Sequence, residues 1–423
     1  MKVIRRPKAR SSVFDRTGVI RITCPRGAGG VLAEEASFAG LQPTVPDENV
    51  NDAVELNGTL ADCMRLNLEM RTANRVFFRL CTFSAADPEA LYRQVLEFPW
   101  EEYLTPASPL SVHGFVRNPT IKDSRFANLK VKDAIADRFR SRFGRRPDSG
   151  PERTGFVVFL HWDQSRVQLY IDTSGQTLAR HGYRKIPLDA PLQESLAAAL
   201  VQSTGWDRRL PFVNPMCGSG TLAIEAALLA AGTAPGLLRG NFGFMHVVGF
   251  SRRRWEAMRS EAEARRRAET RPAGPIMATD IREEAVAAAR KNARIAGVES
   301  RIAFSVCDFR ESRLPEPPGV VVLNPPYGER LGDESALADL YPAIGDFFKQ
   351  RCAGYRGFVL TGNPALAKRI GLRACSRKVF FNGPIECRLL EYELYEGTRR
   401  RPVPDGSEPK VPGRRVAHSK RGG

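Results

Sequence analysis

Short apolar runs, separated by helical segments, fill the second half of this chain. Runs of this length bounded by Gly, Pro or Asp are typical of strands that are buried on both faces of a parallel sheet. The pattern therefore predicts an α/β domain with a Rossmann-like sheet. The predicted strands cover residues 210–213, 276–279, 304–307, 320–323, 379–381 and 389–395, the last two as closing antiparallel strands.

The first half alternates strands and helices, which predicts an α+β region. The predicted strands cover residues 19–23, 75–80, 110–115 and 156–161, and the predicted helices cover residues 31–40, 88–97 and 131–143. Within the second half, residues 191–200 and 222–231 are predicted helices. Residues 252–271 carry charges of both signs at helical spacing, which favours a solvated helix over an RNA contact.

The sequence Asn324-Pro325-Pro326-Tyr327 comes directly after the predicted strand 320–323. Two prolines cannot continue a central strand, so the chain leaves the sheet at the edge where open α/β sheets bind ligands. The Asn324 oxygen and a neighbouring backbone carbonyl make a pair of acceptors that suits an exocyclic amino group, and Tyr327 can stack on a flat base. The arrangement resembles the signature of S-adenosylmethionine-dependent methyltransferases acting on amino or amide nitrogens. A simple Pro-rich turn is the structural alternative.

A second candidate site follows the predicted strand 210–213. Gly218 and Gly220 allow close backbone approach to a ligand, and the helix behind them offers free N–H donors. A nicotinamide site would use the same turn, but its third Gly is absent and the next strand-end acid, Asp280, lies about sixty residues on rather than about twenty. Asp280 could accept hydrogen bonds from a ribose diol, and Asp308 could lie near an adenine. Each acid alone is also consistent with a solvated loop.

Several stretches of the chain resemble a known family. Residues 214–221 are similar to the Asp-Pro-Met-Cys-Gly-Ser-Gly-Thr loop of THUMP-domain RNA guanine-N2 methyltransferases, in particular the group that acts on bacterial 23S rRNA. Similar stretches also lie at 131–135, 172–175, 180–184, 190–199, 234–236, 324–331 and 382–387. One departure is Asn214, where the family usually has Asp. Asn keeps an acceptor but loses the charge that could hold the cationic end of the cofactor.

The resemblance implies three domains, a cofactor and three groups of site residues. The domains are a ferredoxin-like part at 17–56, a THUMP RNA-binding domain at 57–170 and a methyltransferase domain at 185–396. Residues 397–423 are rich in Pro, Gly and Arg with few apolar residues, which predicts a basic disordered tail. The cofactor is S-adenosyl-L-methionine, with Asn214, Pro215, Cys217, Gly218, Ser219, Gly220, Thr221, Asp280, Ile281 and Asp308 as the residues expected to bind it. The expected catalytic residues are Asn324, Pro325, Pro326 and Tyr327. The expected RNA-binding residues are Lys122, Arg125, Lys130 and Lys132, around a helix start where phosphates would gain from the dipole, although ordinary surface lysines are the alternative.

The charge of the chain points to a polyanionic partner. The formal net charge is +17; residues 1–16 hold six basic residues and one acid, and residues 397–423 hold eight basic residues and two acids. Most of the excess therefore lies in two tails. Such tails often bind nucleic acid, although they can serve solubility alone.

The remaining composition excludes several protein classes. No run approaches the roughly eighteen apolar residues of a membrane span, and the basic N-terminus lacks the apolar region of a secretory signal. Eight scattered cysteines without Cys-x-x-Cys spacing argue against a metal site and favour a reducing, cytoplasmic location. The five histidines form no cluster, and His181 is expected to be structural.

These features predict S-adenosylmethionine-dependent methylation of a guanine N2 in 23S rRNA or in a pre-50S assembly intermediate. A tRNA guanine-N2 methyltransferase is the closest alternative, because THUMP domains occur there as well. A DNA adenine methyltransferase would need a separate target-recognition domain, and a release-factor glutamine methyltransferase needs neither a THUMP-like half nor basic tails. From another class, a non-catalytic RNA-binding or ribosome-assembly factor could retain a worn cofactor site.

Overall fold

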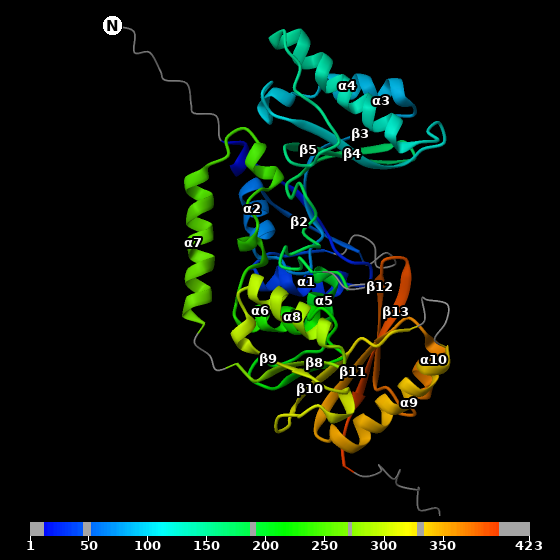
Figure 1. Cartoon of the computed structure of the whole chain (residues 1–423). Coiled ribbons are helices and arrows are strands. Elements are labelled where there is room, and N and C mark those ends of the chain that lie inside the picture. Colours follow the sequence, from blue (N-terminus) through cyan, green and yellow to red (C-terminus); the bar gives the residue numbers. More distant parts are fainter. Residues whose placement is uncertain (1–11, 45–51, 187–191, 270–272, 328–333, 397–423) are drawn as a thin grey trace, which may run out of the picture.

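The computed structural model describes residues 12–44, 52–186, 192–269, 273–327 and 334–396 (Figure 1). The segments 1–11 and 397–423, including the disorder predicted for the latter, lie outside the described residues. So do residues 328–331 of the similar stretch that begins at Asn324.

Six strands of the N-terminal half form one continuous sheet in the order β2-β1-β3-β6-β5-β4. β3 joins its two parts, because it pairs with β1 over residues 75–78 and with β6 over residues 77–84. Neighbouring strands are antiparallel except β4 and β5, which are parallel. The strands are β1 (Thr17–Thr23), β2 (Ala53–Thr59), β3 (Arg75–Ser84), β4 (Leu110–Arg117), β5 (Phe156–Asp163) and β6 (Arg166–Asp172).

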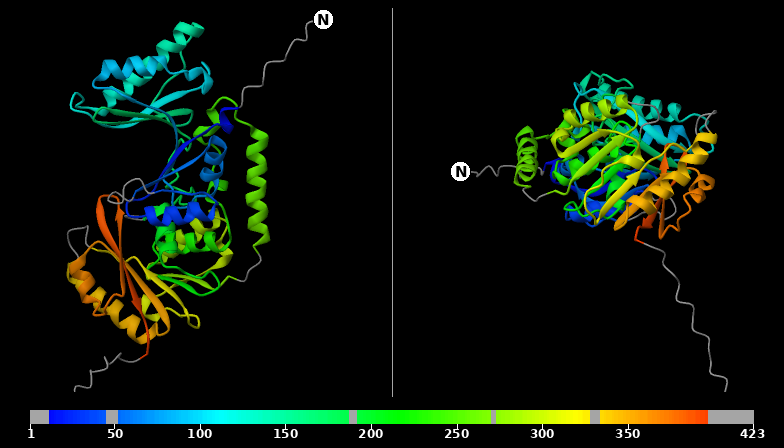
Figure 2. Two further views of the ribbon diagram at one scale, coloured as in Figure 1. Left: turned by 180° about the vertical axis from the view of Figure 1, so that it is seen from behind. Right: turned by 60° about the horizontal axis from the view of Figure 1, so that its bottom comes forward.

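Four helices cover one face of this sheet. Alternate strand residues such as Ile20, Ile22 and Leu160 are fully buried beneath them, whereas the residues between point to the opposite face. The helices are α1 (Gly29–Phe38), α2 (Leu60–Glu69), α3 (Pro88–Glu97) and α4 (Ser124–Phe143). α3 and α4 lie on the side of their strands that is turned away from the rest of the molecule (Figures 1 and 2).

The structure extends several predicted elements in this half. The helix predicted at 131–143 begins at Ser124, because the Asp123 side chain accepts the N–H of Arg125 and so caps a polar segment that resembles a loop. β2, α2 and β6 are not predicted from the pattern. Thr59 and Asp62 form a capping box that starts α2 directly after β2. The expected domain boundary between residues 56 and 57 falls inside β2.

Seven strands of the C-terminal half form a second sheet in the order β12-β13-β11-β10-β7-β8-β9. The five strands from β11 to β9 are parallel. β13 pairs antiparallel with β11, and β12 pairs antiparallel with β13, so this hairpin closes the sheet with antiparallel pairs as predicted. The strands are β7 (Phe212–Pro215), β8 (Ile276–Asp280), β9 (Ile302–Val306), β10 (Gly319–Leu323), β11 (Tyr355–Thr361), β12 (Ser376–Asn382) and β13 (Ile385–Glu393).

Helices lie on both faces of this sheet (Figure 1). Val320 and Val322 of β10 join the core that contains α5 (Glu194–Ser203), α6 (Thr221–Ala230) and α8 (Glu283–Ile295), whereas Val321 and Leu323 join the core that contains α9 (Glu334–Arg351) and α10 (Pro364–Arg369). Burial on both faces explains why this strand is a continuous apolar run.

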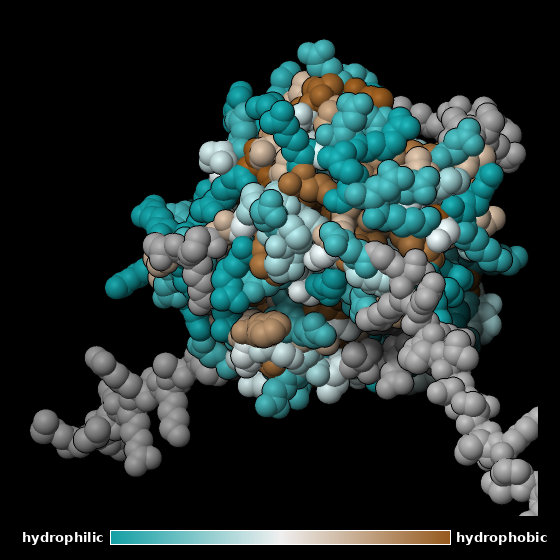
Figure 3. All heavy atoms as spheres, turned by 90° about the horizontal axis from the view of Figure 1, so that it is seen from below, coloured by the Kyte–Doolittle hydropathy of each residue, from teal (hydrophilic) through white to brown (hydrophobic). Residues whose placement is uncertain are grey.

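The charged segment predicted as a solvated helix is α7 (Arg252–Ala268), which stands along one side of the molecule and contacts α2 (Figure 1). Only Trp255 and Ala262 of this helix are buried. The face of the molecule seen from below is largely hydrophilic, with small scattered apolar areas (Figure 3). No helix among the described residues is both long and apolar enough to cross a membrane.

The two halves contact each other at the hairpin β12–β13. The Phe381 N–H donates to the Arg26 carbonyl at 3.1 Å, and the Arg26 guanidinium lies 4.1 Å from the centroid of the Phe381 ring. The backbone of Gly27, at φ +92°, passes so close to β12 that a Cβ would meet the Val379 carbonyl oxygen at 2.3 Å. The ferredoxin-like part is thus packed closely against β12.

Candidate active site

The two predicted loops meet at the centre of the second sheet. β7 and β10 are neighbours, and the chain continues outward from β7 to β8 and β9 on one side and from β10 to β11 on the other. The strand order therefore reverses between β7 and β10, which is where open α/β sheets bind ligands. Because these strands are parallel, Asn214, Asp280 and Asn324 lie at the same edge.

The glycine-rich loop between β7 and α6 needs its glycines for two different reasons. Gly220 has φ +83°, and a Cβ there would meet the Cβ of Ala289 in α8 at 2.8 Å. Gly218 has φ +55°, but nothing lies within 4 Å of the position that its Cβ would occupy. Gly220 thus permits close helix packing, whereas Gly218 leaves its backbone open to a ligand.

Asp280, at the end of β8, is nearly buried and shapes this loop. One carboxylate oxygen accepts the N–H of Gly218 at 2.9 Å, and the other accepts the N–H of Arg282 at 3.1 Å. A carboxylate has room for further donors, so binding to a ribose diol stays a prediction. Ile281 beside it is 67% exposed, so its side chain is accessible to a ligand, and its contact with the cofactor stays a prediction.

Asp308 follows β9 and caps a short 3₁₀ helix. Its side chain accepts the Arg310 N–H at 2.8 Å and pairs with the Arg310 guanidinium at 2.6 Å. That hydrogen-bonded pair lowers the pKa of Asp308, so the group is ionised at neutral pH. Its position is the predicted one, at the end of the third strand from the centre of this edge, while its contact with an adenine stays a prediction.

Asn214 is buried near the end of β7, and its side-chain amide has a structural function. The Nδ2 group donates to the carbonyl of Val322 in β10 at 2.9 Å, which a carboxylate could not do. Its Oδ1 atom is buried and has no hydrogen-bond partner among the described residues. This oxygen is an acceptor left available for a donor on a ligand, such as the amino group of S-adenosylmethionine.

Asn214→Asp is expected to have opposite effects on stability and on cofactor binding. The free protein should lose about 1–3 kcal/mol, because the buried Val322 carbonyl loses its donor. Calorimetry should show tighter binding of S-adenosylmethionine, because the new carboxylate faces a cationic ligand. Asn214→Ala removes both functions and is the matched control, with weaker binding expected. Unchanged or weaker binding by the Asp variant would mean that this position does not sense the charge of the cofactor.

The Asn-Pro-Pro-Tyr segment leaves β10 at the same edge. The Asn324 Oδ1 atom is buried and without a partner among the described residues, as expected for an acceptor kept for a substrate. Pro325 is buried and Pro326 is exposed. The Tyr341 hydroxyl of α9 donates to the Pro326 carbonyl at 3.4 Å and also lies 2.9 Å from the Thr361 hydroxyl. The loop is therefore held from the side of α9.

Tyr327 is held by the hairpin β12–β13. Its hydroxyl accepts the Asn382 Nδ2 group at 2.9 Å, and the Cys387 Sγ lies 3.8 Å from it. The edge of its ring lies against Gly362, where a Cβ would come within 3.1 Å of the ring. The similar stretch 382–387 therefore supports the ring predicted to stack on a base. The sequence resemblance includes the stretch 382–387, but it does not predict that Asn382 contacts Tyr327, which is 55 residues away in the chain.

The four predicted RNA-binding residues are not gathered at the start of α4: Lys122 precedes the helix, and Arg125, Lys130 and Lys132 are spread along it. Because the helix begins at Ser124, only Lys122 and Arg125 flank its N-terminus. Their role in binding RNA stays a prediction. Three of the four have an acidic neighbour: Arg125 pairs with Asp123 at 2.7 Å, Lys130 with Glu89 at 2.6 Å and Lys132 with Asp133 at 3.3 Å.

His181 is part of a buried cluster between the halves. Its Nδ1 lies 2.8 Å from the Glu225 carboxylate and its Nε2 lies 2.9 Å from the Arg71 carbonyl. A carboxylate and a carbonyl oxygen both accept hydrogen bonds, so this arrangement favours the protonated imidazole, in which both ring nitrogens donate. Burial lowers the pKa of His181, but Glu225 more than offsets this, and the pKa is raised. The Tyr183 hydroxyl donates to the same Glu225 oxygen at 2.7 Å. His181 is thus structural, as expected.

Three family models match successive parts of the chain. The RlmL ferredoxin-like domain matches residues 20–77, the THUMP domain matches residues 85–172, and the RMKL-like methyltransferase domain matches residues 181–391. Their order confirms the predicted fold class, with an α+β ferredoxin-like and THUMP region before a Rossmann-like methyltransferase domain.

Individual proteins are similar over most of the chain. The ribosomal RNA large subunit methyltransferase K/L of Syntrophotalea carbinolica is 40% identical over 382 residues, which are 88% of this chain and 53% of that protein. A putative RNA methyltransferase of Synechocystis is 37% identical over 88% of this chain and 96% of that protein. The crystal structure of SMU.472, a putative methyltransferase complexed with SAH, has a TM-score of 0.80 at 28% identity and covers 92% of this chain and 100% of that one. The chain spans about half the length of the K/L relative and nearly all of the Synechocystis protein.

Proposed function

Because this chain belongs to the RlmK/L-like family of S-adenosylmethionine-dependent RNA methyltransferases, we propose that it methylates the exocyclic N2 of a guanine in 23S rRNA. The proposed substrate is the rRNA itself or a pre-50S assembly intermediate. The rRNA methyltransferase name of the Syntrophotalea relative and the THUMP match support rRNA as the substrate class.

One observation carries the proposal: the Oδ1 atom of Asn324 at the end of β10 is buried and has no hydrogen-bond partner in the part of the chain that the structure describes. A buried acceptor without a donor costs free energy, so its presence beside the strand switch point favours a substrate donor. A guanine amino group offers two hydrogens, which Asn324 and the Pro325 carbonyl can accept together. Tyr327, held by Asn382, can stack on the base.

The chemistry requires positioning more than proton transfer. The lone pair of a guanine amino nitrogen is delocalised into the ring, so the nitrogen is a poor nucleophile. When S-adenosylmethionine is bound, it supplies an electrophilic methyl group on an excellent leaving group. Asn324 and the Pro325 carbonyl orient the amino group and stabilise the positive charge that grows on nitrogen. The nitrogen gains the methyl group and loses one proton to water, so the chain does not need a strong base. Orientation of two reactants can be worth roughly 7–11 kcal/mol.

The bound base must leave its stack before it can reach Asn324. Enzymes that modify a base in nucleic acid take it out of the helix or act on an unpaired segment. Sequence-specific recognition of RNA likewise favours loops and bulges. An rRNA loop is therefore the proposed kind of target.

Nucleoside mass spectrometry tests the proposal. The rRNA and tRNA of a deletion strain are compared with those of the parent, and the purified protein is then incubated with each RNA and S-adenosylmethionine. The proposal expects N2-methylguanosine to be lost from 23S rRNA and restored by the protein. Loss from tRNA alone would identify the closest alternative function. A protein that binds RNA but neither binds S-adenosylmethionine nor methylates would be a non-catalytic factor.

The basic tail contributes a separate prediction. Deleting residues 397–423 removes eight basic residues and should weaken RNA binding across sequences. The slope of log affinity against log salt should flatten by roughly 0.7–0.9 for each phosphate that the shortened protein no longer neutralises. Filter binding at several salt concentrations measures it, with methylated-nucleoside analysis as the control for an unchanged target base. An unchanged slope would leave the tail with a role in solubility only.

A further inference from the structure

One face of the N-terminal sheet carries charged and aromatic side chains in place of a helical cover. Directly paired residues of neighbouring strands point to the same face, and the register pairs Arg79 with Tyr170, Tyr170 with Phe159, and Phe115 with His161. This face lies opposite the buried core beneath α1 to α4. We call it the helix-free face; its half-buried and exposed members include Arg21, Arg79, Phe115, Arg117, His161 and Arg166.

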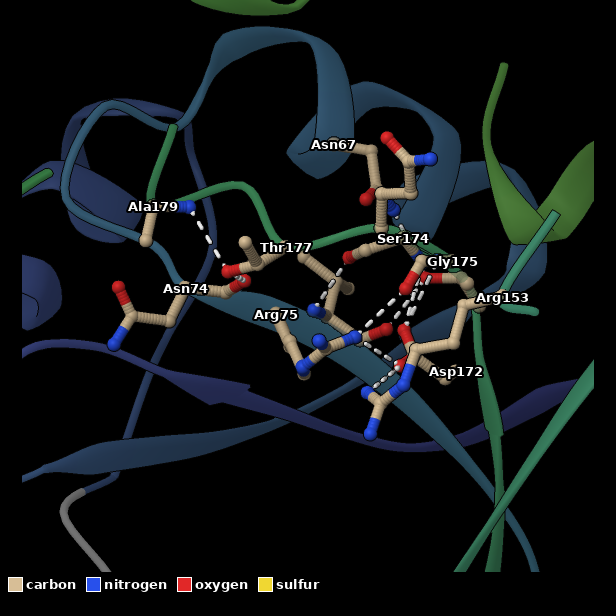
Figure 4. A network of polar contacts seen from close by, with 12 residues as sticks. Asn67, Asn74, Arg75, Arg153, Asp172, Ser174, Gly175, Thr177 and Ala179 are labelled. Carbon is tan, nitrogen blue, oxygen red and sulfur yellow. Dashed lines mark hydrogen bonds and ion pairs between the residues drawn. The ribbon is translucent and has the colours of Figure 1, made fainter. Parts of the chain in front are cut away.

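Two arginines meet one acidic residue where β6 ends (Figure 4). Asp172, the last residue of β6, is fully buried, and one of its oxygens lies 2.5 Å from Arg75 and 3.5 Å from Arg153. Its other oxygen accepts the N–H groups of Ser174 and Gly175. One negative charge is thus shared by two guanidinium groups, whose side chains stay partly exposed.

Two arginines also share one acidic residue further along the face. Glu55 pairs with Arg21 at 3.1 Å and with Arg79 at 4.0 Å. Arg117 and Asp163, in contrast, form a one-to-one pair. Where two arginines share one carboxylate, the group keeps a net positive charge, and some guanidinium N–H groups remain available to other acceptors. An excess of arginine over acid on one face suits the phosphates of a nucleic acid.

Aromatic rings lie among these arginines. Phe115 is 52% exposed and its ring is stacked beside His161, with centroids 5.5 Å apart and an interplanar angle of 23°. Burial, and next the charge of Arg21, lower the pKa of His161, so its ring is neutral at pH 7 and presents aromatic surface. On the same face, Phe77 and Phe159 pack against each other with centroids 4.6 Å apart.

The helix-free face is turned toward the methyltransferase half. α3 and α4 lie on the outer side of the THUMP strands, so the opposite face of those strands looks toward the end of the molecule from which β12 and β13 rise (Figures 1 and 2). That hairpin holds Tyr327 through Asn382. An RNA strand bound on this face would therefore lie on the side of the sheet that looks toward Tyr327. The predicted RNA-binding residues of α4 lie on the other side of the sheet.

We propose that the helix-free face binds a single-stranded segment of the RNA substrate, with Phe115 stacking on a base and the surrounding arginines contacting phosphates. Exposed aromatic rings within a basic surface bind unpaired bases with little sequence preference, because every base has a flat face. A duplex hides those base faces. The inference rests on the proposed function and adds to it where the substrate is held.

The test compares two exposed phenylalanines on opposite faces of the same domain in the full chain. Phe115→Ala should weaken the binding of a fluorescein-labelled, unstructured oligoribonucleotide about tenfold, the scale of losing one stacked base. Phe126→Ala is the matched control, because Phe126 is 48% exposed but lies on α4 near Lys130. It should change binding less than about twofold. Phe115→Trp keeps a flat ring and should bind as the unchanged protein does.

Each outcome decides the matter. Stronger dependence on Phe126 than on Phe115 would place the RNA on the α4 side and overturn the inference. Equal affinity for the oligonucleotide and for its duplex, with no effect of Phe115→Ala, would also overturn it. If the protein methylates RNA while the Phe115 variants bind normally, the inference fails and the proposed function stands. If the unchanged protein neither binds nor methylates RNA, the proposed function fails as well.

Discussion

Replacing Asn324 with alanine will lower the rate of methyl transfer by about 10²-fold or more, the scale of losing one group that stabilises a transition state. The expected reason is that the amino group of the target base loses the side-chain acceptor that orients it and stabilises the charge growing on nitrogen. Single-turnover assays with radiolabelled S-adenosylmethionine measure the rate. Affinity for the cofactor should stay nearly unchanged, because the glycine-rich loop that is predicted to bind it is intact in this variant.

Asn324→Asp is the control for this prediction. Aspartate keeps an acceptor at the same position, so its rate should lie between those of alanine and asparagine. Both variants should melt near the temperature of the unchanged protein, since Asn324 Oδ1 makes no hydrogen bond within the described residues. Near-normal turnover by Asn324→Ala would refute the role assigned to this amide.

Replacing Glu225 with alanine will destabilise the folded protein by about 3–5 kcal/mol, as expected when one partner of a buried ion pair is removed. Glu225 is fully buried, and its carboxylate accepts hydrogen bonds from His181 and Tyr183. Without it, the Nδ1 atom of His181 and the Tyr183 hydroxyl remain buried and unpaired. Urea unfolding measures the free energy. Because His181 also bonds to the Arg71 carbonyl, the variant should loosen the contact between the two halves.

A double-mutant cycle is the control for the Glu225 prediction. His181→Ala should also be destabilising, but the double variant should lose less than the sum of the two, with a coupling of about 0.5–3 kcal/mol. Additive losses would mean that the two side chains do not act as a pair.

The pH dependence of stability should change sign in the same variant. Glu225 raises the pKa of His181 in the folded state above its unfolded value of about 6.5. Its contribution to stability is therefore complete below pH of about 6.5 and is lost as pH rises through the folded pKa. In Glu225→Ala, burial and the charge of Arg71 lower the pKa of His181, whereas the charge of Glu194 raises it. Because burial is the largest of these effects, we expect the folded pKa to lie below the unfolded value, so that stability is instead lost as pH falls below about 6.5. The gap between the two proteins should narrow toward alkaline pH.

Local sequence features predicted the two loops at the carboxyl edge of the second sheet because each loop is contiguous along the chain. The loop at 214–221 and the segment at 324–327 each follow an apolar strand, and the breakers within them mark where the chain leaves the sheet. Sheet order then brings the two together. The start of α4 was misplaced because its first turns are polar and its cap is a single Asp.

What the sequence did not reveal are pairs that form only when distant segments meet. Tyr327 and Asn382 are 55 residues apart, and His181 and Glu225 are 44 residues apart. Glu225 lies within an otherwise apolar helix, so a charged side chain in such a run is a signal that could have indicated a buried partner. The helix-free face was missed for the same reason, since Arg21, Phe115 and His161 come from three strands.

The continuous sheet of the N-terminal half has a consequence for the length of RNA between a segment bound on the THUMP strands and the target base. β3 pairs with the ferredoxin-like strand β1 at one end and with the THUMP strand β6 at the other, so backbone hydrogen bonds of one sheet join the two parts. The ferredoxin-like part is in turn fixed to β12 beside Gly27. An RNA held on the THUMP strands would reach Asn324 at one set spacing. Lengthening or shortening the RNA between the bound segment and the target guanine should then shift or abolish methylation, even with both sequences unchanged.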